Sequence, residues 1–256
     1  MAALGNQSIA SSYEQLLHVD TDGGGNTTTL VPVKDGDNGT TFALQLSTTT
    51  AVIDNPTTSS SSQGGILRLQ SDDGAVMASG HRLGVIEFGG AEDTSSTITT
   101  GARIEALTDA TWSASENGAD MVFYTTDGNA SQTEVMRLTA DNKVGIGGNP
   151  TLDVKGGTVS DTQIIGTDAG ASLTIGRFSN DTGGASIILA KSKAVSQSAF
   201  NSTPVKVEDD HEVGIISFCV DDGSDLRSDV ASVLAEVDDG DTTANEIGGA
   251  LVLKTT

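Results

Sequence analysis

The strongest constraint on this chain is an internal repeat. Two blocks recur 130 residues further along: 81–88 (HRLGVIEF) as 211–218 (HEVGIISF), and 121–126 (MVFYTT) as 251–256 (LVLKTT). A third block recurs at an offset of 120, 64–69 as 184–189, so the second copy carries extra residues in a loop around 191–210. A period this long exceeds the coil of a solenoid and indicates a small domain used twice.

The composition favours short β-strands within each copy. Hydrophobic residues make up 36% of the chain, and its 31 glycines accompany many Asp, Ser, Thr and Asn residues that form turns. Upstream, 42–47 alternates as a strand does, 55–63 is a Ser-rich linker, and the spacing in 8–19 indicates one or two helical turns. Residues 226–237 have apolar spacings that fit a helix or a strand. Their counterpart near 101–108 has weak helical periodicity, so we interpret both as strands.

Residues 135–154 predict strand, turn, strand, turn, strand. The turn at 140–143 contains Asp and Asn, which tolerate left-handed backbone angles. Gly145 and Gly147 suit a place where two backbones approach closely, and Pro150 ends the strand that contains them. These three residues are our structural candidates.

Within this stretch, MRLTADNKVGIGGNPTLDVKGG (136–157) resembles the linker that recurs in bacteriophage tail-fibre and other virion-fibre proteins, which often carry a C-terminal intramolecular chaperone. It departs from that pattern at Gly148-Asn149, where Thr and Ser or Asn are more usual. The resemblance implies a non-enzymatic structural protein of the virion that forms a homotrimer. It also implies an N-terminal segment that attaches to other virion proteins. The distal end would present or recognise a host surface, with a surface glycan as one candidate partner.

The fold class that we expect is all-β and elongated. Two copies of a small antiparallel β-domain would be joined by β-rich connectors and intertwined as a homotrimer. Short glycine-rich strands leave unpaired sheet edges and thin cores. Strands and apolar faces that pair between chains would satisfy the edges and thicken the cores. The expected segments are 1–62 for attachment, 63–155 for the first repeat with its linker, and 156–256 for the second. The second copy stops where the first continues into an Asp-Gly turn, so we expect a longer natural chain.

Two other functions stay open. One is a capsid decoration or head-fibre protein. The other is a glycan-depolymerising tailspike, which usually has a parallel β-helix. No coil repeat of about 20–30 residues supports such a helix here.

Charge and motifs exclude several classes of function. A net charge of −22 argues against nucleic acid and anionic membranes as partners, because both need a basic footprint. No apolar run approaches the ~20 residues of a membrane span, so membrane insertion is not expected. A single Cys219 excludes an intrachain disulfide, and its apolar neighbours suggest that it is buried. No cofactor is expected, since Gly145-x-Gly147-x-x-Pro150 fails the dinucleotide fingerprint at its third glycine.

Candidate ligands are few. His81 and His211 occupy equivalent places just before a strand and could ring a metal ion on a threefold axis. Neither has a second ligand type at useful spacing, so we expect no metal and interpret both as strand-edge residues. Trp112, Phe123 and Tyr124 could form a sugar-binding platform, but phenylalanines 88, 123, 178 and 218 are better explained as core.

Overall fold

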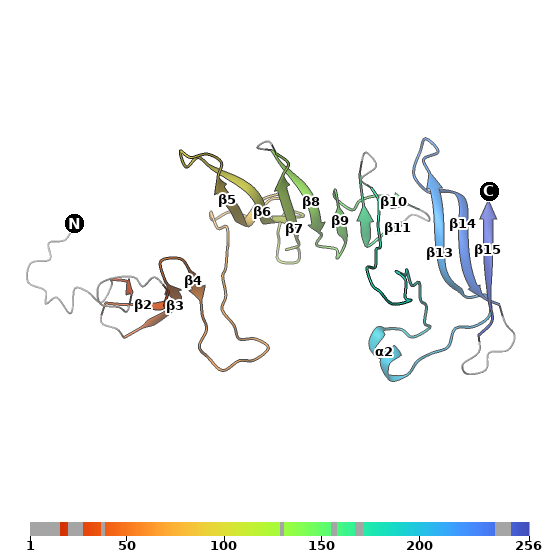
Figure 1. The fold of residues 1–256 in the computed structure, drawn as a ribbon, viewed down its shortest axis with the longest axis horizontal. Coiled ribbons are helices and arrows are strands. Elements are labelled where there is room, and N and C mark those ends of the chain that lie inside the picture. Colours follow the sequence, from red (N-terminus) through yellow and green to blue (C-terminus); the bar gives the residue numbers. More distant parts are fainter. Residues whose placement is uncertain are drawn as a thin grey trace, which may run out of the picture. The chain divides into compact units, whose positions relative to one another are not determined.

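Figure 1 shows a computed structural model of the chain, which describes residues 16–19, 28–36, 39–128, 131–154, 158–166, 171–238 and 247–255. The chain divides into two compact units, residues 1–70 and 71–256. Most of the helical turn predicted for 8–19 lies outside the described residues. Its last two residues are not helical: His18–Val19 form strand β1, whose backbone pairs with Lys34 and Val33. The three segments expected from the sequence stay a prediction.

The first unit is a four-stranded antiparallel sheet with its strands in chain order. These strands are β1, β2 (Val31–Lys34), β3 (Thr41–Leu46) and β4 (Ala51–Ile53). Val31 and Val33 alternate with half-buried neighbours and supply its buried apolar side chains. The strand predicted at 42–47 is confirmed as β3, and the Ser-rich segment 55–63 contains no strand, as its composition indicates.

The second unit begins with a six-stranded sheet in the order β12-β9-β8-β7-β6-β5. Its strands are β5 (Arg82–Ala91), β6 (Ile98–Thr108), β7 (Ala119–Thr126), β8 (Gln132–Leu138), β9 (Val144–Ile146) and β12 (Thr162–Ile164). Within the expected first repeat, 63–155, every pair in this sheet is antiparallel, and the sheet as a whole is mixed because β9 and β12 run parallel. The reason is the intervening hairpin of β10 (Asp153–Val154) and β11 (Thr158–Val159), after which the chain returns in the direction of β9.

The residues predicted to form turns within 135–154 do form turns. Asn142 adopts a left-handed φ of 66° between β8 and β9. Antiparallel pairing then sets Leu138 opposite Val144, and Gly147 takes a φ of 83° where β9 ends. The predicted order of strand, turn, strand, turn, strand is therefore confirmed as β8, β9 and β10.

A three-stranded antiparallel sheet ends the chain: β13 (Glu212–Val220), β14 (Ser228–Val237) and β15 (Gly249–Thr255). The ambiguous segment at 226–237 is confirmed as a strand. The loop predicted around 191–210 also contains a short helix, α2 (Gln197–Ser202). It begins where Ser196 Oγ accepts the Ala199 N–H at 3.1 Å, which is an ordinary N-cap.

The β5-β6-β7 and β13-β14-β15 sheets share their register. Ile86, Ile104 and Phe123 lie opposite one another on successive strands, as Ile216, Val233 and Leu253 do. The register shifts of β5 recur at the equivalent places in β13: Arg82/Gly84 and Phe88/Gly89 in the first, Glu212/Gly214 and Phe218/Cys219 in the second.

Few hydrophobic side chains are buried in the part of the chain that the structure describes. Among the described residues, five hydrophobic side chains are buried: Val31, Val33, Val122, Leu234 and Val237. Three of the phenylalanines assigned to the core, Phe88, Phe178 and Phe218, are more than half exposed, so that assignment is wrong for a single chain. Phe88 and Phe218 lie in strands β5 and β13, whereas Phe178 lies outside any helix or strand.

Candidate functional site

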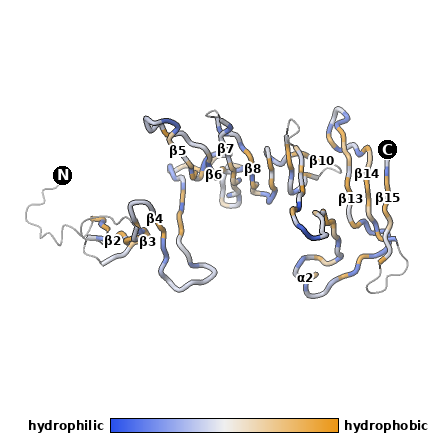
Figure 2. Tube along the Cα trace, in the orientation of Figure 1, coloured by the Kyte–Doolittle hydropathy of each residue, from blue (hydrophilic) through white to orange (hydrophobic). Residues whose placement is uncertain are grey.

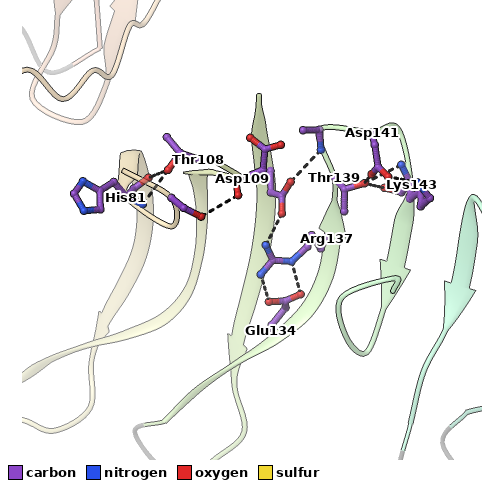
Figure 3. A network of polar contacts seen from close by, with 11 residues as sticks. His81, Thr108, Asp109, Glu134, Arg137, Thr139, Asp141 and Lys143 are labelled. Carbon is purple, nitrogen blue, oxygen red and sulfur yellow. Dashed lines mark hydrogen bonds and ion pairs between the residues drawn. The ribbon is translucent and has the colours of Figure 1, made fainter. Parts of the chain in front are cut away.

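One face of the six-stranded sheet carries a network of ion pairs centred on Arg137 in β8 (Figure 3). Arg137 donates twice to Glu134, from Nε to Oε1 at 2.9 Å and from Nη2 to Oε2 at 2.6 Å. Its Nη1 donates to Asp120 Oδ2 in β7 at 2.7 Å, and Asp120 Oδ1 accepts the Ala140 N–H at 3.0 Å. Glu134 raises the pKa of the guanidinium, burial opposes this, and Asp120 adds to the rise.

A second group of charges lies on the same face, around Glu105 in β6. This side chain is almost fully buried, and its carboxylate contacts Arg82 Nη2 at 2.7 Å and Arg103 Nη2 at 3.3 Å. The Arg103 guanidinium also stacks over the Tyr124 ring, 3.8 Å from its centroid. Burial alone would raise the pKa of Glu105, but hydrogen bonds from Arg103 and Tyr124 outweigh it, so the pKa lies below the ordinary value of 4.5.

These contacts predict that the six-stranded sheet loses stability at acidic pH. Because the folded-state pKa of Glu105 is depressed, its contribution to stability is fully present above the unfolded-state value near 4.5. That contribution is lost as the pH falls below 4.5 toward the folded-state pKa. We expect the melting temperature of wild-type protein to fall more steeply below pH 4.5 than that of Glu105→Gln. Thermal melts by circular dichroism between pH 3 and 7 measure this, and parallel profiles would contradict it.

A shallow depression of about 580 Å³ opens beside the Arg137 network. Its lining includes Ser79, Asp109, Asp120 and Thr139. Asp120 is already committed to Arg137, and Ser79 Oγ donates to the Asp109 carbonyl oxygen at 2.9 Å. Within the described residues, no group of three or more His, Cys, Asp or Glu side chains could hold a metal ion. The depression is therefore best explained as the open end of a sheet held by ion pairs.

His81 and His211 make the same contacts in the two sheets. Each ring Nδ1 accepts a backbone N–H three residues earlier at 3.4 Å, from Ala78 and Glu208 respectively. Each backbone carbonyl accepts an N–H from the end of the neighbouring strand, from Thr108 at 3.0 Å and Val237 at 2.9 Å. In both cases the imidazole closes the turn that leads into β5 or β13. That neither binds a metal stays a prediction.

Gly145 and Pro150 are both buried and lie against each other. A Cβ on Gly145 would stand 2.0 Å from the Gly148 carbonyl oxygen and 2.7 Å from Pro150 Cδ. The turn after β9 thus folds back over the backbone of Gly145. A Cβ on Gly147 would meet the Ile165 carbonyl oxygen at 2.1 Å. How far Gly145, Gly147 and Pro150 matter for assembly stays a prediction.

The three aromatic residues considered as a sugar platform do not come together. Phe123 and Tyr124 are adjacent in β7 and point to opposite faces of the sheet. Trp112 lies in the loop before β7, where its indole N–H donates to the Gly118 carbonyl oxygen at 2.9 Å. Cys219 is half-buried rather than buried, and its Sγ lies 3.4 Å from Asp229 Oδ1.

Sequence reasoning missed the ion-pair network, although one signal for it was available. Arg103 and Glu105 alternate within β6, which places opposite charges on one face. Glu134 and Arg137 lack that spacing, because residues three apart in a regular strand face opposite ways. A bulge that leaves Val135 without an opposite residue in β7 turns Glu134 to the face of Arg137.

The chain matches solved structures, but it matches neither family models nor curated proteins. Among solved structures, the carboxy-terminal domain of the bacteriophage T5 L-shaped tail fibre matches with a TM-score of 0.58 and 14% identity, over 78% of this chain and 80% of that chain. The chain is similar in fold to a phage tail-fibre domain.

A second structure of that tail-fibre domain, which includes its intramolecular chaperone domain, matches with a TM-score of 0.59 and 13% identity. The match covers 77% of this chain and 55% of that longer one. At these identities the likeness establishes the fold, and it agrees with the resemblance seen at 136–157. No helix in the described part is long and apolar enough to cross a membrane.

Proposed function

We propose that this chain is a non-enzymatic structural component of a phage virion, a fibre or spike segment that attaches to the particle and presents or recognises a host surface. The observation that carries the proposal is the fold similarity to the T5 tail-fibre domain over 78% of the chain. The linker sequence at 136–157 supports it independently, because it resembles fibre linkers by its residues rather than by its fold.

The proposal includes two copies of one small β-domain in a homotrimer. The shared register and the equivalent bulges of β5-β6-β7 and β13-β14-β15 support the duplication. The small number of buried apolar side chains among the described residues supports association between chains, since a chain of this length that folds alone has a larger core. By analogy with fibres, the N-terminal segment contacts other virion proteins and the distal part contacts a host surface glycan.

Two alternatives make different predictions. A capsid decoration protein has the same structural chemistry at another place on the particle. A glycan-depolymerising tailspike needs a pair of carboxylates free for acid and base catalysis. Here Glu105, Asp120 and Glu134 are each engaged by arginine, which argues against that role for them.

Immunogold labelling of the virion tests the proposal. Antibodies raised against residues 71–256 are expected to decorate thin fibres at the tail. Labelling spread over the capsid would favour the decoration protein, and a particle without label would overturn the virion assignment. A capsule or lipopolysaccharide depolymerisation assay with the purified chain is expected to release no oligosaccharide, and release of oligosaccharide would favour the tailspike.

A further inference from the structure

Large apolar side chains are exposed on the strands of the second unit. Among its described residues, the apolar strand residues that are each at least 43% exposed include Ile86, Phe88, Met121, Ile146, Ile216, Phe218, Leu251 and Leu253. Contiguous exposed apolar surface is rare on soluble monomers and marks sites that another molecule covers.

Apolar residues line one face of the six-stranded sheet and one face of the last sheet. Residues directly opposite on neighbouring strands share a face, so the register defines rows. One row crosses the whole six-stranded sheet: Ile86, Ile104, Phe123, Met136, Ile146 and Ile164. Its counterpart in the last sheet consists of Ile216, Val233 and Leu253. We call the faces that carry these rows the apolar faces; Figure 2 shows hydrophobic positions recurring along these strands.

The apolar faces hold no ionisable residue in their central rows or in the rows beside them. On the six-stranded sheet the flanking rows are Gly84, Ala106, Met121, Leu138, Val144 and Thr162, and Phe88, Ala102, Thr125 and Thr133. On the last sheet they are Gly214, Ala235 and Leu251, and Phe218, Ala231 and Thr255. In a chain with a net charge of −22, these are surfaces where copies can meet without repulsion.

The opposite face of the six-stranded sheet does not need a partner. Glu105 is 4% exposed and Val122 is 0% exposed in the single chain, because the arginine side chains and their ion pairs lie across them. The polar face is thus covered by its own side chains. The apolar face is left with Ile86, Phe88 and Met121 each 45% exposed or more.

Two segments, residues 65–69 and 184–189, complete the pattern. Both lie outside any helix, strand or turn, and neither forms a backbone hydrogen bond with any residue in the described part of the chain. Both carry large apolar side chains that are 45–81% exposed: Ile66, Leu67 and Leu69 in the first, and Ile187, Ile188 and Leu189 in the second. Each precedes a strand that ends its sheet, β5 or β13, whose outer edge is open in the described residues.

From these observations we infer that the apolar faces are where copies of this chain meet, and that residues 65–69 and 184–189 pair as strands with a neighbouring copy at the open edges of β5 and β13. The inference rests on the homotrimer proposed above and specifies its interface. A second copy fits better than an unrelated partner because each chain supplies both parts of the contact, an exposed segment and an open strand edge. It does so at two equivalent places, 65–69 with β5 and 184–189 with β13. Strand addition at an open sheet edge supplies backbone hydrogen bonds to both elements.

Adjacent residues of β15 provide a matched pair of variants. Leu253 lies on the apolar face and is 74% exposed in the single chain, while Lys254 is exposed on the other face. We expect Leu253→Asp to weaken association at least tenfold, because it places a carboxylate where copies meet, and Lys254→Asp to leave it unchanged. Sedimentation equilibrium of the full chain measures this. Equal effects of the two variants, or none, would overturn the interface while leaving a trimeric fibre intact.

Hydrogen exchange tests the paired segments without any substitution. In the assembled wild-type chain, the amides of residues 66–69 and 187–189 are expected to exchange at least a hundredfold more slowly than those of the Ser-rich segment 57–61. Exchange at the same rate as 57–61 would overturn the strand pairing. A wild-type chain that sediments as a monomer would overturn the interface and the trimer together, whereas virion labelling tests the fibre assignment separately.

Discussion

Replacing Gly145 by alanine is expected to lower the free energy of unfolding by about 2–3 kcal/mol, beyond the ~1 kcal/mol range of strand propensities. The added methyl group would overlap the Gly148 carbonyl oxygen at 2.0 Å and Pro150 Cδ at 2.7 Å. Both are parts of a turn that is held to β9, so neither can move as a flexible side chain would. The turn must open or β9 must shift, and the pairing of β9 with β8 and β12 weakens.

Gly90→Ala is the control for this substitution. Gly90 also lies in a strand, β5, but a Cβ there would meet no atom within 4 Å. We expect its free energy of unfolding to stay within about 0.5 kcal/mol of wild type or to rise slightly, because alanine restricts the unfolded chain. Urea denaturation at one protein concentration compares the two variants. Equal stabilities would mean that the turn adapts and that Gly145 is only a flexible spacer.

The strands and turns of the central stretch, 135–154, could be predicted from the sequence because they depend on local residue preferences. Alternating side chains define β8, Asn142 takes the left-handed conformation that its residue type favours, and Gly147 ends β9 with positive φ. The strands at 81–88 and 211–218 could be predicted for a different reason, since two copies of one sequence pattern support the same assignment. The equivalent register of β5 and β13 is consistent with that reading.

Features that depend on contacts between distant parts of the chain could not be predicted from the sequence. The parallel pairing of β12 with β9 depends on how the β10-β11 hairpin returns the chain, and no local residue preference encodes it. Phe88 and Phe218 alternate as core residues do, yet they lie uncovered in the chain by itself. Alternation shows that a face is apolar, and it cannot show whether the cover comes from the same chain or from another.

The ion-pair network gives the largest expected effect. Arg137→Met is expected to lower the free energy of unfolding by about 3–5 kcal/mol, because it leaves two carboxylates, Asp120 and Glu134, without their counter-charge in a poorly hydrated site. The control is Arg177→Met. Arg177 is paired with Asp181 at the surface, so its loss is expected to cost under about 1 kcal/mol. Equal losses in urea denaturation would show that the Arg137 site is hydrated.

A triple variant, Arg137→Met with Asp120→Asn and Glu134→Gln, separates the value of the ion pairs from the cost of unpaired charges. If most of the loss comes from carboxylates left without a cation, neutral amides in their place should restore more than half of the lost stability. The two introduced amide side chains can still accept hydrogen bonds, including the one that Asp120 Oδ1 receives from the Ala140 N–H in the wild-type chain. A triple variant as unstable as Arg137→Met alone would instead mean that the guanidinium stabilises β7 and β8 by packing across Val122, its opposite residue in the register.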